Sequence, residues 1–74
     1  MQLTVKLFAT FRQGRFEVAQ LERPAGETVA GLIDALSLPR EELGFVLERA
    51  RHAEPDQRLQ EGDTVSIFPK VGGG

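Results

Sequence analysis

The chain has 74 residues and a net charge of -2, with nine basic and eleven acidic residues mixed along it. This length suits one domain, and the absence of cysteine excludes disulfides, thiolate metal sites and cysteine nucleophiles. Because the pI is about 5.3, and neither a signal-peptide pattern nor an apolar run near the ~20 residues of a membrane span occurs, we expect a soluble, cytoplasmic protein that binds neither nucleic acid nor membrane.

Alternating polar and apolar residues predict two N-terminal strands. The first covers residues 2–8 and shows the period of a half-buried strand. Its inward residues are Leu3, Val5 and Leu7. Residues 9–14 are turn-forming, and a second strand at about 15–21 is expected to complete a hairpin. Its expected inward residues are Phe16, Val18 and Leu21.

A helix is predicted at about residues 29–37. Thr28 is its expected N-cap, because the side-chain oxygen can accept a hydrogen bond from the first turn. Its apolar stripe consists of Val29, Leu32, Ile33 and Leu36. Pro39 disfavours helix at the residue before it. One further helical turn is expected from Pro39 to Leu43, ended by Gly44.

The C-terminal half is expected to hold short strands and one long one. Phe45-Val46-Leu47 predicts a short buried strand, whereas residues 48–58 are polar and irregular, with a short strand near 51–54. Leu59 is expected to enter the core from a loop, and Gly62-Asp63 to form a turn. The strand at 64–68 is the clearest of the chain. Its expected inward residues are Val65 and Ile67.

This order of elements predicts an α+β roll. One main helix covers one face of a sheet in which the last strand lies beside the first. The expected domain covers residues 1–69, and residues 70–74 form a flexible C-terminal glycine tail.

Gly72, Gly73 and Gly74 end the sequence. One interpretation is an ordinary frayed terminus. The other is a segment that a partner protein orders, since glycine has no Cβ and can pass through a narrow channel. From Pro69 to Gly74 an extended chain reaches about 20 Å, at ~3.3 Å per residue. We favour the second interpretation, in which Gly72 and Gly73 thread into an enzyme and the Gly74 carboxylate reacts.

Much of the chain resembles the MoaD/ThiS family of ubiquitin-like sulfur carriers. The specific match is the block Leu59…Glu61-Gly62-Asp63-Thr64-Val65-Ser66-Ile67-Phe68-Pro69, followed by Val71-Gly72-Gly73-Gly74. Weaker agreement covers residues 3–9, 26–29 and 38–44. The resemblance implies a ubiquitin-like β-grasp fold with a mixed sheet. It also implies that an E1-like enzyme uses ATP to adenylate Gly74, which then becomes a thiocarboxylate.

The same resemblance implies two alternative sulfur acceptors. One is the large subunit of molybdopterin synthase, with this chain as the non-catalytic small subunit, and the other is thiazole synthase in thiamine synthesis. The Phe68-Pro69 lead-in favours the molybdopterin branch. A ubiquitin-like modifier that forms isopeptides through Gly74, and a plain interaction domain with a dispensable tail, remain further alternatives.

Arg49-Ala50 departs from the family, whose members often carry Asn-Gly in this tight turn. A type I′ turn requires positive φ at both central residues, which Arg and Ala resist by ~1–2 kcal/mol each. We therefore expect a longer or irregular connection, with residues 48–54 less regularly paired.

Phe8 and Phe68 fall on the outward register of strands that are neighbours in a β-grasp sheet. We expect them to form a docking patch, which Phe11 extends, and we assign partner binding to Phe8, Phe68, Pro69 and Val71. The alternatives are scattered surface residues or a bulge that turns one ring inward.

Other polar residues offer no further chemistry. His52 alone in a polar loop is a poor metal or acid–base site, and the adjacent Glu41 and Glu42 point apart on a helix. Arg12 and Arg15 flank Gly14 and are interpreted as solubilising charges around a turn, with contact to a partner as the alternative. No glycine-rich phosphate loop is present, so we expect no bound cofactor, and ATP to be used by the activating enzyme.

Overall fold

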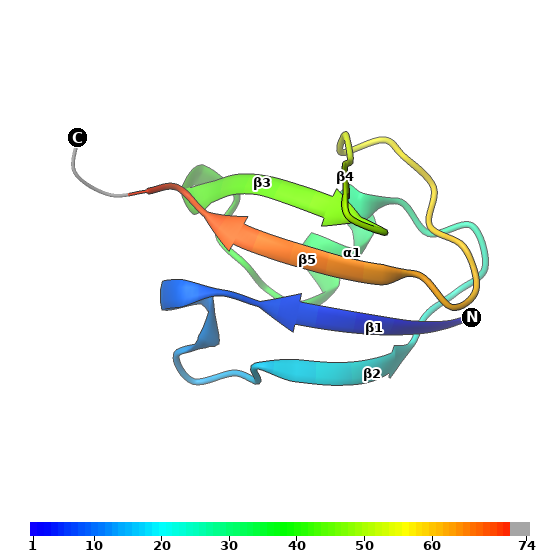
Figure 1. Ribbon diagram of the computed structural model, residues 1–74, viewed down its shortest axis with the longest axis horizontal. Helices are drawn as coiled ribbons and strands as arrows, with labels where there is room; N and C mark the ends of the chain where they lie inside the picture. Colours follow the sequence, from blue (N-terminus) through cyan, green and yellow to red (C-terminus); the bar gives the residue numbers. More distant parts are fainter. Residues whose placement is uncertain (72–74) are drawn as a thin grey trace.

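The computed structural model describes residues 1–71, so the predicted roles of Gly72, Gly73 and Gly74 concern residues outside the described part. A five-stranded sheet in the order β2-β1-β5-β3-β4 forms the body of the domain (Figure 1). The elements are β1 (Gln2–Leu7), η1 (Ala9–Arg12), β2 (Val18–Glu22), α1 (Val29–Ala35), η2 (Arg40–Glu42), β3 (Leu43–Glu48), β4 (Arg51–His52) and β5 (Thr64–Pro69), where η marks a 3₁₀ helix.

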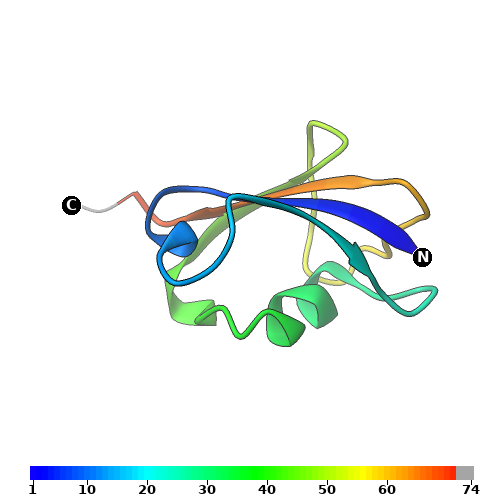
Figure 2. The same ribbon diagram turned by 90° about the horizontal axis from the view of Figure 1, so that it is seen from below.

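The sheet is mixed, and helices cover only one of its faces. β1 and β5 are parallel neighbours at the centre, whereas β1–β2, β3–β5 and β3–β4 are antiparallel. Figure 2 shows α1 and η2 on the same side of the sheet. This arrangement confirms the predicted α+β roll with the last strand beside the first. No helix within residues 1–71 is long and apolar enough to cross a membrane.

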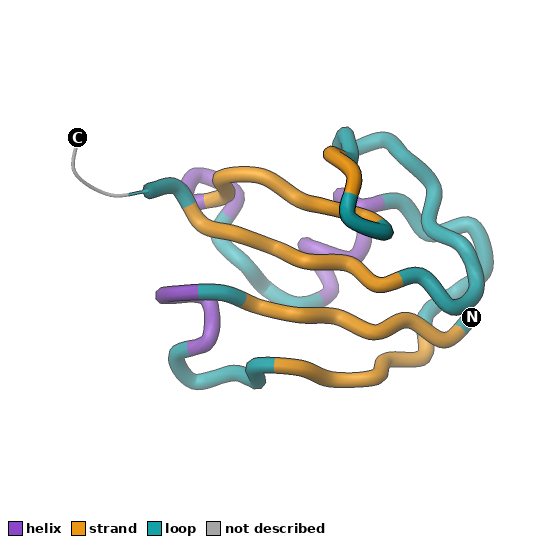
Figure 3. Tube along the Cα trace, viewed as in Figure 1, coloured by secondary structure: helices purple, strands orange, loops and turns teal. Residues whose placement is uncertain are grey.

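The helix is held by its cap and by its apolar stripe. The Thr28 side chain accepts a hydrogen bond from the Gly31 N–H at 3.1 Å, as expected of an N-cap. Val29, Leu32 and Ile33 are buried against the sheet, where Val65 and Ile67 of β5 are fully covered. Leu59 enters this core from the long loop between β4 and β5 (Figure 3), which confirms its predicted place.

The register of the first hairpin differs from the prediction. Ala19 lies opposite Val5 and Leu21 opposite Leu3, so these residues share the core-facing side. Val18 pairs with Lys6 and is 54% exposed, so its predicted inward orientation is wrong. The strand begins later than expected. Phe16 therefore precedes it and packs against the core from the loop.

Two phenylalanines also exchange the places that the sequence predicted. Phe11, expected on the surface, is 2% exposed, because η1 turns its ring into the core. Phe45, expected in a buried strand, is 40% exposed, while its neighbour Val46 is buried. Gly44 does not end the preceding helical turn, because β3 already begins at Leu43.

The connection from β3 to β4 is a two-residue turn, so the predicted irregular loop is wrong. Arg49 has a φ of 53° and Ala50 a φ of 67°, which are the positive values that a type I′ turn requires. The flanking residues Glu48 and Arg51 are paired in register.

Tertiary contacts explain why this turn forms without glycine. The Arg49 N–H donates to Thr64 O at 2.9 Å, and the Ala53 N–H donates to Val46 O at 2.9 Å. Ala53 is also buried. Backbone hydrogen bonds contribute about 1 kcal/mol each. Together with burial they offset the cost of two left-handed residues.

We expect Ala50→Gly to stabilise the domain by about 0.5–1 kcal/mol, because glycine adopts the left-handed conformation without strain. The greater conformational freedom of glycine in the unfolded chain offsets part of this gain. Thermal unfolding measures this. Ala30→Gly within α1 is the control and should destabilise by about 1 kcal/mol. A melting temperature for Ala50→Gly at or below that of the unaltered chain would contradict the strain argument.

Candidate functional site

Three phenylalanines stack on the open face of the sheet: Phe45 of β3, Phe68 of β5, and Phe8, which directly follows β1. The Phe8 and Phe68 ring centroids are 4.2 Å apart with planes inclined by 10°, and those of Phe45 and Phe68 are 4.4 Å apart at 11°. We call these residues the aromatic ladder. Val46 and Ile67, which alternate with Phe45 and Phe68 along their strands, are buried on the opposite side under α1.

The ladder lies outside the core. None of its three rings belongs to the buried cluster, so the alternative that a bulge turns one of them inward does not hold. Phe68 is in the middle and contacts both other rings. The adjacency of Phe8 and Phe68 follows from the parallel pairing of β1 with β5, continued where the Phe8 N–H donates to Ile67 O at 3.2 Å.

A groove of about 420 Å³ runs beside the ladder at the end of β5. Its lining is largely apolar and comes from the start of η1, from the ladder and from the segment that follows β5. The lining residues are Phe8, Ala9, Thr10, Phe45, Phe68, Pro69, Lys70 and Val71. The structure therefore brings all four predicted partner-binding residues together at the place where the chain leaves the sheet. Val71 is 92% exposed there.

Arg12 supplies a positive charge at the edge of this surface. Its guanidinium carbon lies 5.4 Å from the Phe8 ring centroid, within the range of a cation–π contact. Its Nε donates to Leu7 O at 2.8 Å, which holds the side chain over the ring. Sequence reasoning assigned Arg12 a solubilising role and missed this contact, because nothing local indicates that η1 folds back beside Phe8.

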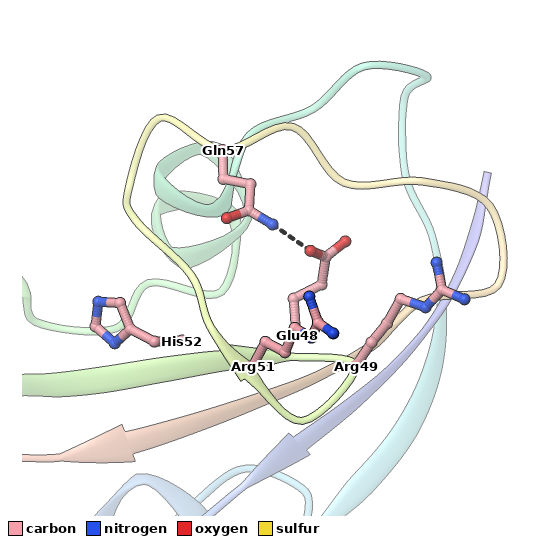
Figure 4. Close-up of a pocket in the computed structure, with 5 residues that line it drawn as sticks. All are labelled: Glu48, Arg49, Arg51, His52 and Gln57. Atoms are coloured by element: carbon pink, nitrogen blue, oxygen red, sulfur yellow. Dashed lines mark hydrogen bonds between the residues drawn. The ribbon is translucent and has the colours of Figure 1, made fainter.

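A second hollow, of about 580 Å³, is polar and lies at the β3–β4 hairpin (Figure 4). Its lining residues are Glu48, Arg49, Arg51, His52 and Gln57. Glu48 accepts a hydrogen bond from the Gln57 amide. Hydrogen bonding to Asp63 and then partial burial raise the pKa of Glu48. Asp63 itself is buried and accepts a hydrogen bond from the Gln60 N–H at 2.8 Å, within the turn before β5.

The hollow holds no metal site among the residues that the structure describes. His52 is exposed on β4, and its Nε2 lies 3.3 Å from Glu54 Oε1. Glu41 and Glu42 are exposed on η2. The apolar groove is therefore the better candidate for a functional surface.

Comparison with known proteins relates the whole domain to one family. The sequence profile of the ThiS family matches residues 5–74. No curated protein sequence matched the chain.

Solved structures agree with this match. The putative molybdopterin converting factor subunit 1 from Pyrococcus furiosus is 30% identical with a TM-score of 0.78, covering 96% of this chain and 99% of its own. The small archaeal modifier protein 1 from H. volcanii is 23% identical with a TM-score of 0.77, over 95% and 98%. A chain in the complex of subunits 1 and 2 of the molybdopterin-converting factor from Helicobacter pylori is 17% identical with a TM-score of 0.68, over 100% of both chains. The last two show the fold alone.

Proposed function

The chain belongs to the ThiS family of ubiquitin-like sulfur carriers, and we propose that its Gly74 carboxylate is adenylated, converted to a thiocarboxylate and used as a sulfur donor in molybdopterin biosynthesis. The observation that carries this proposal is the family match, which extends through the glycines at residues 72–74. The molybdopterin branch is supported by the 30% identity to a putative molybdopterin converting factor subunit 1.

The proposed chemistry overcomes the poor reactivity of a carboxylate. A Gly74 carboxylate oxygen attacks the α-phosphorus of ATP, and pyrophosphate leaves. Hydrosulfide, supplied by the sulfur donor, then attacks the acyl carbon. AMP leaves with the oxygen through which it was bound, and the C-terminal thiocarboxylate remains. Glycine suits this step because it places no side chain beside the acyl carbon. ATP is used by an E1-like activating enzyme, and the carrier is a co-substrate.

The groove supports a docking role for the folded domain. Its apolar lining includes residues on both sides of Pro69, so a protein bound there is beside the segment that leads to Gly74. We propose that the activating enzyme and the sulfur-acceptor enzyme bind this surface in turn. The large subunit of molybdopterin synthase is the proposed acceptor, supported by the Helicobacter pylori complex, in which subunits 1 and 2 are assembled.

Intact-protein mass spectrometry tests the proposal. The chain is incubated with an E1-like enzyme, ATP and a sulfur donor, with a reaction lacking ATP as the control. We expect a mass increase equal to the replacement of one oxygen by sulfur at the C-terminus. Conjugation to lysines with no thiocarboxylate would instead indicate a protein modifier. An unchanged mass would contradict both.

The sulfur acceptor is then identified by adding the thiocarboxylate form to each candidate enzyme with its own substrate. Molybdopterin formed with the synthase large subunit is the expected result. Transfer to thiazole synthase alone would place the chain in thiamine synthesis.

A further inference from the structure

We propose that Gly44 is a positioning residue that fixes the direction in which the chain leaves β5, and thereby the place where a docked enzyme meets Gly74. This inference rests on the proposed function. It concerns the described residues at the exit, not the glycines beyond them. Gly44 lies in β3, beside the end of β5.

The backbone of β5 occupies the space where a side chain at position 44 would lie. A Cβ on Gly44 would lie 2.4 Å from Pro69 O, 2.7 Å from Pro69 C and 3.0 Å from Lys70 N. A Cβ on Gly31, in contrast, would meet only side-chain atoms, those of Glu27, and Gly62 has open space but a φ of 83°. Among the described glycines, Gly44 is the one at which a neighbouring backbone lies too close to leave room for a side chain.

This close approach occurs at a bulge. Leu43 pairs with Pro69 and Phe45 pairs with Phe68, so Gly44 is the extra residue on β3. A β-bulge bends its strand and redirects the chain locally. The bulge brings Glu42 O to 2.8 Å from the Lys70 N–H, which donates to it. Pro69 has no N–H to donate, so the Lys70 hydrogen bond holds the exit at this point.

The bulge also links the exit to the docking surface. Phe45 follows Gly44, and Phe68 precedes Pro69, so two members of the aromatic ladder flank the close contact. For a partner that binds the ladder, the distance to the point where the chain leaves β5 and the direction of the chain there are therefore fixed. Positioning of this kind matters because a shift of about 1 Å at a reacting group can reduce a rate by as much as about 100-fold.

Gly44→Ala tests the inference, with Gly62→Ala as the matched control. Gly62→Ala introduces left-handed strain at the opposite end of β5 and lowers the melting temperature without touching the exit. For Gly44→Ala we expect faster hydrogen exchange of the Lys70 amide and a fall of ~10- to 100-fold in kcat of ATP–pyrophosphate exchange, with KM changed less than about threefold. Gly62→Ala should keep both the Lys70 protection and kcat.

A second pair of variants covers the case in which Gly44→Ala does not fold. Lys70→Pro removes the N–H that donates to Glu42 O and adds no atoms at position 44. Lys70→Ala removes only the side chain, so the difference between these two variants measures the contribution of the N–H. We expect kcat for Lys70→Pro to be at least about tenfold below that for Lys70→Ala.

Each outcome decides the inference. Equal losses of kcat in Gly44→Ala and Gly62→Ala, or unchanged Lys70 exchange in Gly44→Ala, would overturn it. If the unaltered chain supports no ATP–pyrophosphate exchange, the proposed function fails. The Lys70 exchange of Gly44→Ala then still reports whether Gly44 fixes the exit.

Discussion

Deletion of Gly73 and Gly74 is expected to abolish ATP–pyrophosphate exchange by the activating enzyme and to leave the melting temperature of the domain unchanged. The catalytic effect is complete because the proposed nucleophile is the Gly74 carboxylate itself, and truncation withdraws the new carboxylate from the enzyme's active site. The fold is retained because the described core and sheet involve no residue beyond Lys70, whose N–H bonds Glu42 O.

A variant with one alanine added after Gly74 serves as the matched control for length. It keeps every glycine but displaces the carboxylate, so exchange should also be lost. Isotope exchange between pyrophosphate and ATP, measured together with calorimetric unfolding, separates activity from stability. Exchange at the normal rate by the truncated chain would remove the central role assigned to Gly74.

Elements in which the spacing of apolar residues along the sequence determines the buried face were predicted well. The helix at 29–35 shows an apolar stripe and a threonine cap, and β5 alternates Val65 and Ile67 with polar neighbours. In both cases the residues that indicate the element are also the residues that stabilise it, because they are buried on one face. Leu59 was predictable for a related reason, since it is the large apolar residue of a long polar segment.

Positions that depend on pairing with a distant strand were predicted poorly. Val18 and Ala19 are both compatible with an inward position, and the choice is made by register with Lys6 and Val5. The apolar run at Phe45 does not indicate which residue faces the open side. That side is set by pairing with Phe68 on β5. A one-residue change of register reverses every side chain.

Part of the candidate site could be predicted from the sequence, but the full set of its residues could not. Phe8 and Phe68 were expected to lie together because the last strand was predicted to lie beside the first, and the parallel pairing of β1 with β5 places them so. Phe45 and Arg12 were missed. Phe45 joins the site because β3 pairs with β5, and Arg12 joins it because η1 brings its guanidinium over the Phe8 ring. The turn at Arg49 and Ala50 was missed for an energetic reason. The local backbone preference is outweighed by the hydrogen bond from the Arg49 N–H to Thr64 O of β5, by that from the Ala53 N–H to Val46 O of β3, and by burial of Ala53.

Phe68→Ala is expected to weaken binding of the activating enzyme by at least about 2 kcal/mol, which corresponds to ~30-fold in Kd. Phe68 is the middle ring of the ladder and lines the groove, so its removal takes away a central apolar contact and separates Phe8 from Phe45. Loss of two ring stacks should cost the fold about 1–3 kcal/mol. Truncation of a core phenylalanine would cost more, at about 3–5 kcal/mol.

Val18→Ala is the control, because Val18 is an exposed apolar residue on the edge strand β2 and does not line the groove. Its Kd should stay within about twofold of the unaltered chain, since isolated surface positions contribute little to binding. Titration calorimetry gives the affinity, and thermal unfolding of the same samples gives the stability. If Phe68→Ala bound normally but melted as a core variant would, the ladder would be a structural element of the sheet. A weakened affinity in a domain that is still folded at the assay temperature assigns the ladder to docking.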